Sequence, residues 1–308
     1  MKHITFFLFP FVLILFACKT AGIPDSNNDE ISGSDESMAE YDGDWTNQQD
    51  WNEEDDSPKV REIYNPSNTI LTDLVHTKLE VSFNWSESQL NGKATITAKP
   101  HFYESDELIL DAKGMDILKV QMNGADLSYT YNDALKLNID LGRTYKSTEE
   151  YTITIEYISK PDELEMGGSA AIAGDKGLYF INPKGEEKNK MPQIWTQGET
   201  QANSVWFPTI DSPNAKTTQE IYITVEDKYV TLSNGDLVSS KKNKDGTRTD
   251  YWKQDLPHAP YLFMMAIGEY SIVKDSYTKK DGSKIKSIIM LSLNMRKMQE
   301  AFLEKRQI

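Results

Sequence analysis

Much of this chain alternates between apolar and polar residues with a period of two. The alternation is most regular in four runs, at residues 79–85, 135–141, 151–157 and 221–225, in each of which every second residue is aliphatic or aromatic. Successive side chains of a β-strand point to opposite faces, so this pattern places one face against a core and the other in water. The runs therefore predict half-buried β-strands.

Short turns separate the predicted strands. Asn-Gly pairs occur at 123–124 and 234–235, and Asp-Gly pairs occur at 245–246 and 281–282. These pairs are typical of tight hairpin turns, because Asn, Asp and Gly tolerate positive φ angles. Strands joined in this way, without an interleaved helical pattern, predict an all-β fold of antiparallel sheets packed as a β-sandwich. We expect one such domain over residues 61–286.

The first eighteen residues have the pattern of a bacterial lipoprotein signal peptide. Lys2 and His3 precede an apolar run at 4–17, which is shorter than the roughly 20 residues of a membrane-spanning helix. The run ends in Leu-Phe-Ala before Cys18, the only cysteine, and this resembles a lipoprotein processing site at which the cysteine is acylated. The alternative is an ordinary secretory signal with an incidental cysteine. A lone cysteine excludes an internal disulfide.

An acidic segment follows the signal. Residues 20–58 contain thirteen Asp and Glu but no Lys or Arg, so they carry most of the formal net charge of −15. Few aliphatic residues are present to offset the entropy of ordering, so we expect residues 19–60 to be a disordered tether. Its charge would repel nucleic acid, and no nucleic-acid partner is expected.

The sequence Trp-Thr-Gln-Gly-Glu-Thr at 195–200 predicts a site for a peptide amine. In an extended segment Trp195, Gln197 and Glu199 share one face. A glutamate carboxylate accepts charge-assisted hydrogen bonds from an ammonium group, and the neighbouring amide adds a donor and an acceptor. Gly198 would allow a ligand backbone or a neighbouring strand to come close. The alternative is that both polar residues merely cover a solvated strand.

This sequence and the residues after it resemble the Thr-Gln-x-Glu and Pro-x-x-Asp-x-Pro-x-x-Lys signature of the aminopeptidase N family of zinc metallopeptidases. The second half of the signature matches Pro208, Asp211, Pro213 and Lys216. Further similar segments lie at 177–180, 231–235, 257–262 and 266–270. The resemblance covers roughly residues 73–286 and implies the family's saddle-like, non-catalytic N-terminal β domain.

The resemblance also implies roles for individual residues. Gln197 and Glu199 fall on the positions that hold the N-terminal residue of a substrate, with Glu199 binding its α-amine, while Pro208, Asp211, Pro213 and Lys216 fall on a structural part of the motif. The zinc-binding His-Glu-x-x-His motif and the Gly-x-Met-Glu-Asn motif are absent from this chain. We therefore expect zinc in the intact enzyme, no metal bound by this chain, and no activity without the missing catalytic domain.

The last residues, 287–308, change in character and contain three of the eleven methionines. Read directly, Ile288, Leu291 and Met295 begin the apolar face of an amphipathic helix. Alternatively, a shifted reading frame near residue 287 would spell a sequence that resembles the family's continuation. On that hypothesis the tail is out of frame and the catalytic domain is truncated.

Two functions of different classes remain open. The first is the substrate-anchoring N-terminal domain of an envelope-anchored zinc aminopeptidase, with peptide N-termini, the catalytic domain and a membrane reached through lipidated Cys18 as partners. The second is a non-catalytic surface β-sandwich lipoprotein that binds a peptide or protein. A third role, as a scaffold in transcription complexes, conflicts with the signal sequence. The expected location is the bacterial cell envelope, facing the periplasm or the exterior.

Overall fold

The computed structural model describes residues 69–164 and 176–292, all within the second of two compact units, Ile63–Ile308. The predicted signal peptide, Cys18, the tether at 19–60 and residues 293–308 lie outside the described residues. Within the described part, no helix is long and apolar enough to span a membrane.

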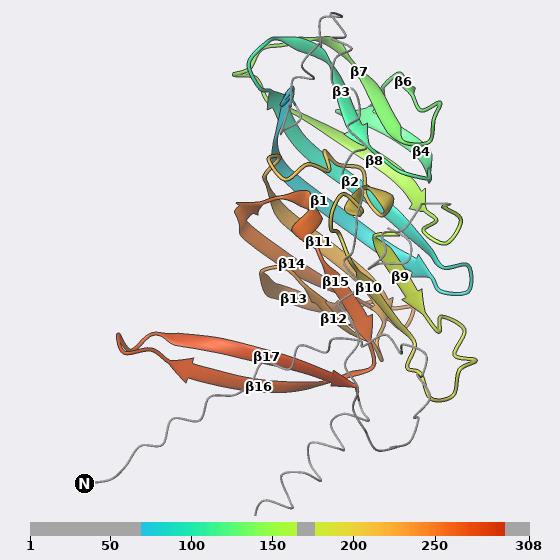
Figure 1. The fold of residues 1–308 in the computed structure, drawn as a ribbon, viewed down its shortest axis with the longest axis vertical. Helices are drawn as coiled ribbons and strands as arrows, with labels where there is room; N and C mark the ends of the chain where they lie inside the picture. The colour runs from blue at the N-terminus through green and yellow to red at the C-terminus, as the bar shows by residue number, and fades with distance from the viewer. Residues whose placement is uncertain (1–68, 165–175, 293–308) are drawn as a thin grey trace, which may run out of the picture. The chain divides into compact units, whose positions relative to one another are not determined.

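The largest element is an eight-stranded sheet in the order β13-β14-β11-β1-β2-β8-β4-β5 (Figure 1). Its strands are β1 (Thr72–Asn84), β2 (Gln89–Pro100), β4 (Met115–Met122), β5 (Ala125–Asp126), β8 (Tyr151–Ser159), β11 (Thr217–Glu226), β13 (Asp236–Lys242) and β14 (Thr247–His258). Neighbouring strands are antiparallel except for β1 and β11, which are parallel. The predicted antiparallel architecture is confirmed, with this one parallel pair as an addition.

Two smaller sheets and a hairpin complete the described fold. A three-stranded sheet has the order β3-β7-β6, with β3 (Ser105–Asp111), β6 (Tyr129–Thr130) and β7 (Lys136–Tyr145). A four-stranded sheet has the order β12-β15-β10-β9, with β9 (Leu178–Ile181), β10 (Gln193–Thr196), β12 (Val230–Ser233) and β15 (Met265–Gly268). The hairpin pairs β16 (Tyr270–Thr278) with β17 (Lys284–Ser292), and two 3₁₀ turns are η1 (Asn203–Val205) and η2 (Pro260–Leu262).

One face of the eight-stranded sheet forms the core. Its register aligns one buried side chain from each of six neighbouring strands, in the order Trp252, Ile221, Leu79, Ala94, Ile155 and Val120. Each large aliphatic or aromatic side chain in such a row contributes about 1.5–3 kcal/mol when fully buried. The opposite face carries charged pairs such as Lys93 and Glu156. The alternation in sequence thus reports burial on one face only.

The smaller sheets cover this apolar face. Phe180 of β9 contacts the rings of Phe83 and Trp85 edge-on, with both centroid distances at 6.3 Å. Buried residues of the three-stranded sheet, including Leu110 and Leu137, belong to the same core cluster. The β-sandwich expected from the sequence is therefore confirmed.

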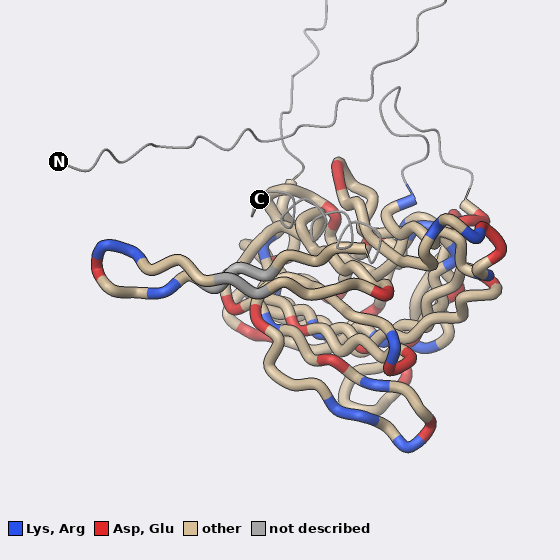
Figure 2. The backbone as a smooth tube through the Cα atoms, turned by 90° about the horizontal axis from the view of Figure 1, so that it is seen from below, with Lys and Arg blue, Asp and Glu red and all other residues tan. Residues whose placement is uncertain are grey.

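The predicted turns all lie between strands. Gly235, for example, has a φ of 79°, and a Cβ at this position would lie 1.9 Å from the carbonyl oxygen of Lys253, so only glycine fits. The β16–β17 turn has the sequence Lys-Lys-Asp-Gly from 279, and Figure 2 shows charged residues concentrated at the tip of this hairpin.

The helical interpretation of the tail is wrong for its first residues. Residues 287–292 complete strand β17, where they pair with β16. The apolar spacing of Ile288 and Leu291 occurs in a strand because the antiparallel partner supplies hydrogen bonds that a short periodic pattern cannot reveal.

Candidate functional site

The residues at 195–200 begin in a paired strand and end in a turn. Trp195 of β10 pairs with Tyr179 of β9 on one side and with Ala266 of β15 on the other. The pairing continues one residue past β10, since the Gln197 N–H donates to the carbonyl oxygen of Gly177 at 2.9 Å. The side chains of Trp195 and Gln197 therefore lie on the same face of the sheet.

Glu199 lies just beyond the end of this pairing. The chain turns here, and the Ala202 N–H donates to the carbonyl oxygen of Gly198 at 3.0 Å. Glu199 is exposed and Gln197 is half-buried. Among the residues that the structure describes, no hydrogen bond or ion pair reaches the Glu199 carboxylate. An exposed, unpaired carboxylate next to an amide is free to accept an incoming cation.

Gly198 fixes the start of the turn against the protein itself. A Cβ at this position would lie 2.1 Å from the carbonyl oxygen of Tyr261 and 2.6 Å from Nδ2 of Asn203. The sequence predicted a ligand backbone or a neighbouring strand close to this glycine, and its close neighbours in the structure are instead the 3₁₀ turn η2 and the side chain of Asn203. No side chain fits at 198 without displacing η2.

Asn203 holds the two 3₁₀ turns together beneath this glycine. It is fully buried, its Nδ2 donates to the carbonyl oxygens of Pro260 at 2.6 Å and Phe263 at 2.8 Å, and its Oδ1 accepts from Nε1 of Trp206 at 2.7 Å. The side-chain amide thus uses both its donor and its acceptor groups internally. A single asparagine in an irregular segment belongs to no periodic or spaced pattern, so this residue could not be predicted from the sequence.

The remaining motif residues divide into buried and exposed positions. Pro208 and Asp211 are buried, whereas Pro213 and Lys216 are exposed. The Asp211 carboxylate accepts the backbone N–H of Ser204 at 2.9 Å, and burial raises the pKa of this carboxyl above its usual range. Asp211 therefore ties the segment after the candidate amine site to η1.

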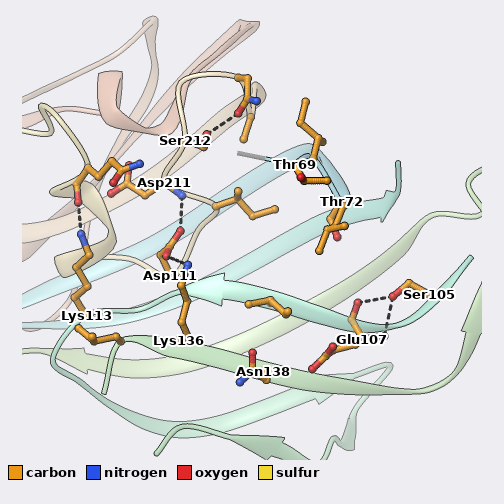
Figure 3. A pocket seen from close by; sticks show the side chains of 18 of the residues that line it. Thr69, Thr72, Ser105, Glu107, Asp111, Lys113, Lys136, Asn138, Asp211 and Ser212 are labelled. Carbon is orange, nitrogen blue, oxygen red and sulfur yellow. Dashed lines mark hydrogen bonds and ion pairs between the residues drawn. The ribbon is translucent and has the colours of Figure 1, made fainter. Parts of the chain in front are cut away.

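A pocket of about 810 Å³ lies beside Asp211, between β1, the three-stranded sheet and residues 210–215 (Figure 3). Its charged groups are largely paired with protein. The Asp111 carboxylate accepts a hydrogen bond from the backbone N–H of Asp211 at 3.0 Å and forms an ion pair with Lys136. The Lys113 ammonium donates to the carbonyl oxygen of Gln201 at 2.5 Å.

Neither Gln197 nor Glu199 lines this pocket. This pocket and the candidate amine site are therefore separate. The Glu199 carboxylate has no partner among the described residues, whereas the Asp111 carboxylate already has two donors.

Sequence comparison decides the family. The profile of the peptidase M1 N-terminal domain matches residues 62–262, about two thirds of the chain. The chain belongs to the peptidase M1 N-terminal domain family. Aminopeptidase N of Haemophilus influenzae is 26% identical over 234 residues, which cover 74% of this chain and 24% of that protein.

Another relative of this M1 domain and a solved structure with a similar fold carry different names. Transcription initiation factor TFIID subunit 2 of Danio rerio is 24% identical over 225 residues, which cover 63% of this chain and 19% of that protein. A crystal structure of the M1 zinc metallopeptidase from Deinococcus radiodurans superimposes with a TM-score of 0.60 at 18% identity, covering 72% of this chain and 48% of that one. This structural similarity supports the fold.

The chain spans about a quarter or less of the length of the Haemophilus influenzae aminopeptidase and of the Danio rerio transcription factor subunit. The M1 domain is thus one part of longer proteins, and the activity of a whole relative does not transfer to the domain by similarity alone.

The described residues of this M1 domain do not fit zinc. They contain no group of three or more His, Cys, Asp or Glu residues placed to hold a metal ion. The three histidines among them have other partners. His76 bonds to Thr218, and His101 to Asp73, both at 2.7 Å, and His258 lies 3.2 Å from the amide oxygen of Gln219.

Proposed function

We propose that this chain is the substrate-anchoring N-terminal domain of a zinc-dependent aminopeptidase. Glu199 binds the α-ammonium group of a peptide, and Gln197 binds its first residue by hydrogen bonds. The observation that carries the proposal is the unpaired Glu199 carboxylate, held at the end of β10 by Gly198 and Asn203, in a domain of the M1 family.

The expected affinity of the chain alone is low. Ion pairs between exposed groups contribute about 0.2–1 kcal/mol, whereas hydrogen bonds to charged groups that are shielded from water contribute about 1.5–3 kcal/mol. Because Glu199 is exposed, the first range applies to the isolated chain. Binding of a small amine ligand should therefore be weak, with a Kd on the order of 1 mM or higher.

Hydrolysis is assigned to another part of the intact enzyme. The described residues contain no group of three or more side chains placed to hold a metal ion, so the water-activating zinc of the family would be held by polypeptide outside them. The chain by itself is then a binding domain without peptidase activity.

The test is a titration of the purified chain with L-leucine amide, monitored by ¹H-¹⁵N NMR. Glu199→Gln should weaken binding by about two- to fivefold, the loss of one exposed ion pair. Glu87→Gln removes the same charge from the β1–β2 turn and should change nothing. N-acetyl-L-leucine amide, which lacks the ammonium group, should bind to the native chain as weakly as the free amide binds to Glu199→Gln. Equal binding of both amides to both proteins would contradict the proposal.

The relative named as a transcription initiation factor subunit favours a second candidate, peptide or protein binding without catalysis. Such a module has no reason to prefer a free amine. Tight binding of N-acetylated peptides, unaffected by Glu199→Gln, would favour this second function.

The location in the cell envelope remains part of the proposal. An acylated Cys18 followed by the acidic segment at 19–60 would hold the domain away from a membrane surface, where peptides are accessible to it.

A further inference from the structure

A row of aromatic and aliphatic residues crosses the outer face of the four-stranded sheet, and its member Trp195 lies two residues before Gln197. Strand pairing aligns Tyr179, Trp195, Ala266 and Leu232 on neighbouring strands. Paired residues project to the same face, and the residues that alternate with them, such as Ile194 and Ile267, are buried in the core. Tyr179, Trp195 and Ala266 therefore face away from the buried residues of this sheet, and Trp195 is 37% exposed, whereas Leu232 on the edge strand packs against the core cluster.

Trp195 and Tyr179 form one flat surface. Their rings are stacked with centroids 4.6 Å apart and an angle of 13° between the planes. On the other side of Trp195 the paired residue is Ala266, whose small side chain covers little of the indole. The stack fixes the orientation of the indole before any ligand arrives, and aromatic side chains offer large contact areas.

The surface is close to the two proposed anchoring residues. Gln197 lies two residues beyond Trp195 on the same face, so their Cα atoms are about 7 Å apart along the strand. Glu199 follows in the turn. A ligand whose ammonium group meets Glu199 and whose first residue contacts Gln197 can extend its first side chain toward Trp195.

We propose that Trp195, oriented by Tyr179, binds the side chain of the N-terminal residue and favours aromatic side chains. The row consists only of aromatic and aliphatic residues, so it complements an uncharged, flat group. This inference rests on the proposed function and specifies the substrate class of the same site.

The test compares L-phenylalanine amide with L-alanine amide in titrations of the full chain. The indole N–H signal of Trp195 is assigned by its loss in Trp195→Phe. Phenylalanine amide should bind on the order of fivefold more tightly than alanine amide, and only the former should shift the indole signal strongly. In Trp195→Ala the two amides should bind equally, while Trp195→Phe should keep part of the preference.

Tyr129→Ala is the matched control, because Tyr129 is an aromatic residue of similar exposure, 39%, on β6. It should leave the preference unchanged. ¹H-¹⁵N spectra that superimpose away from the site would show that each variant is folded.

The outcomes separate this inference from the proposed function. If Glu199→Gln weakens both amides but the native chain does not distinguish between them, the role of Trp195 is refuted and amine anchoring stands. If neither amide depends on Glu199, or neither binds, the proposed function fails and this inference fails with it.

Discussion

Replacing Asn203 with alanine should strongly destabilise the domain near the amine site. The substitution removes the donor to the carbonyl oxygens of Pro260 and Phe263 and the acceptor for the Trp206 indole. All three partner residues are buried, so water cannot replace the lost bonds without entering the core.

The magnitude follows from the number of groups left without a partner. A buried polar group without a hydrogen bond costs about 1–3 kcal/mol, and partial relaxation around the small side chain reduces the sum for three groups to roughly 3–5 kcal/mol. A loss of 4 kcal/mol lowers the folding equilibrium constant by about three orders of magnitude. The same change would release η2 from Gly198, so it should also weaken amine binding.

The assay is equilibrium urea unfolding of the full chain. The midpoint for Asn203→Ala should fall strongly while the m-value stays constant, since the surface exposed on unfolding is similar. Asn243→Ala is the control. The Asn243 amide bonds to the hydroxyls of Thr247 and Thr249 on a partly exposed hairpin. The substitution should therefore lower the free energy of unfolding by no more than about 1 kcal/mol. A loss for Asn203→Ala no larger than that of the control would refute the reasoning.

Two further outcomes concern the acid limit of stability and the membrane anchor. Burial alone would raise the pKa of Asp250, but hydrogen bonds from Arg248, Ser240 and Thr231 hold it below its usual range. The stability from this carboxylate is thus complete above the unfolded pKa of about 3.9 and is lost as the pH falls through the lower folded pKa. Asp250→Asn should lower the free energy of unfolding at pH 7 by about 3–5 kcal/mol and make the unfolding free energy, measured in urea, less dependent on pH below about pH 4. The same pH dependence below about pH 4 in both proteins would contradict this. When the full chain is expressed in a bacterium, it should fractionate with membranes and carry a lipid in intact-mass spectra. The Cys18→Ser variant should do neither. Identical fractionation of the native chain and the variant would exclude lipidation.

The strands were predictable because a strand buried on one face has apolar residues at every second position. Tyr151, Ile153, Ile155 and Tyr157 alternate in this way, and all four are buried in β8. Turn residues were predictable for a separate reason, since positive φ restricts the choice of residue at sites such as Gly235. Both signals are local, and local patterns determined most of the fold.

Long-range pairing left no such signal. β1 lies parallel to β11, with Leu79 beside Ile221, although about 140 residues separate them. The residues on both strands alternate identically whether the pair is parallel or antiparallel. The framework of the candidate site was hidden for the same reason, because Asn203 acts on carbonyl groups near residue 260 that its neighbours in sequence do not reveal.

The exposure of Glu199 has a consequence for how a preference for free N-termini would arise. In the isolated chain the exposed carboxylate is hydrated. A peptide without an ammonium group therefore leaves it without an ion-pair partner at little cost in free energy, and the affinities of free and blocked peptides differ only a few-fold. If a second surface covers the site, the carboxylate is removed from water. A peptide with a blocked N-terminus then leaves it without a cationic partner, and the cost in binding free energy rises to several kcal/mol. The position of Glu199 is then set by Gly198 and Asn203 in this domain, while the strength of the preference depends on whatever excludes water from above it. Anchoring of the amine and the strength of the preference for free N-termini would therefore belong to different parts of the intact protein.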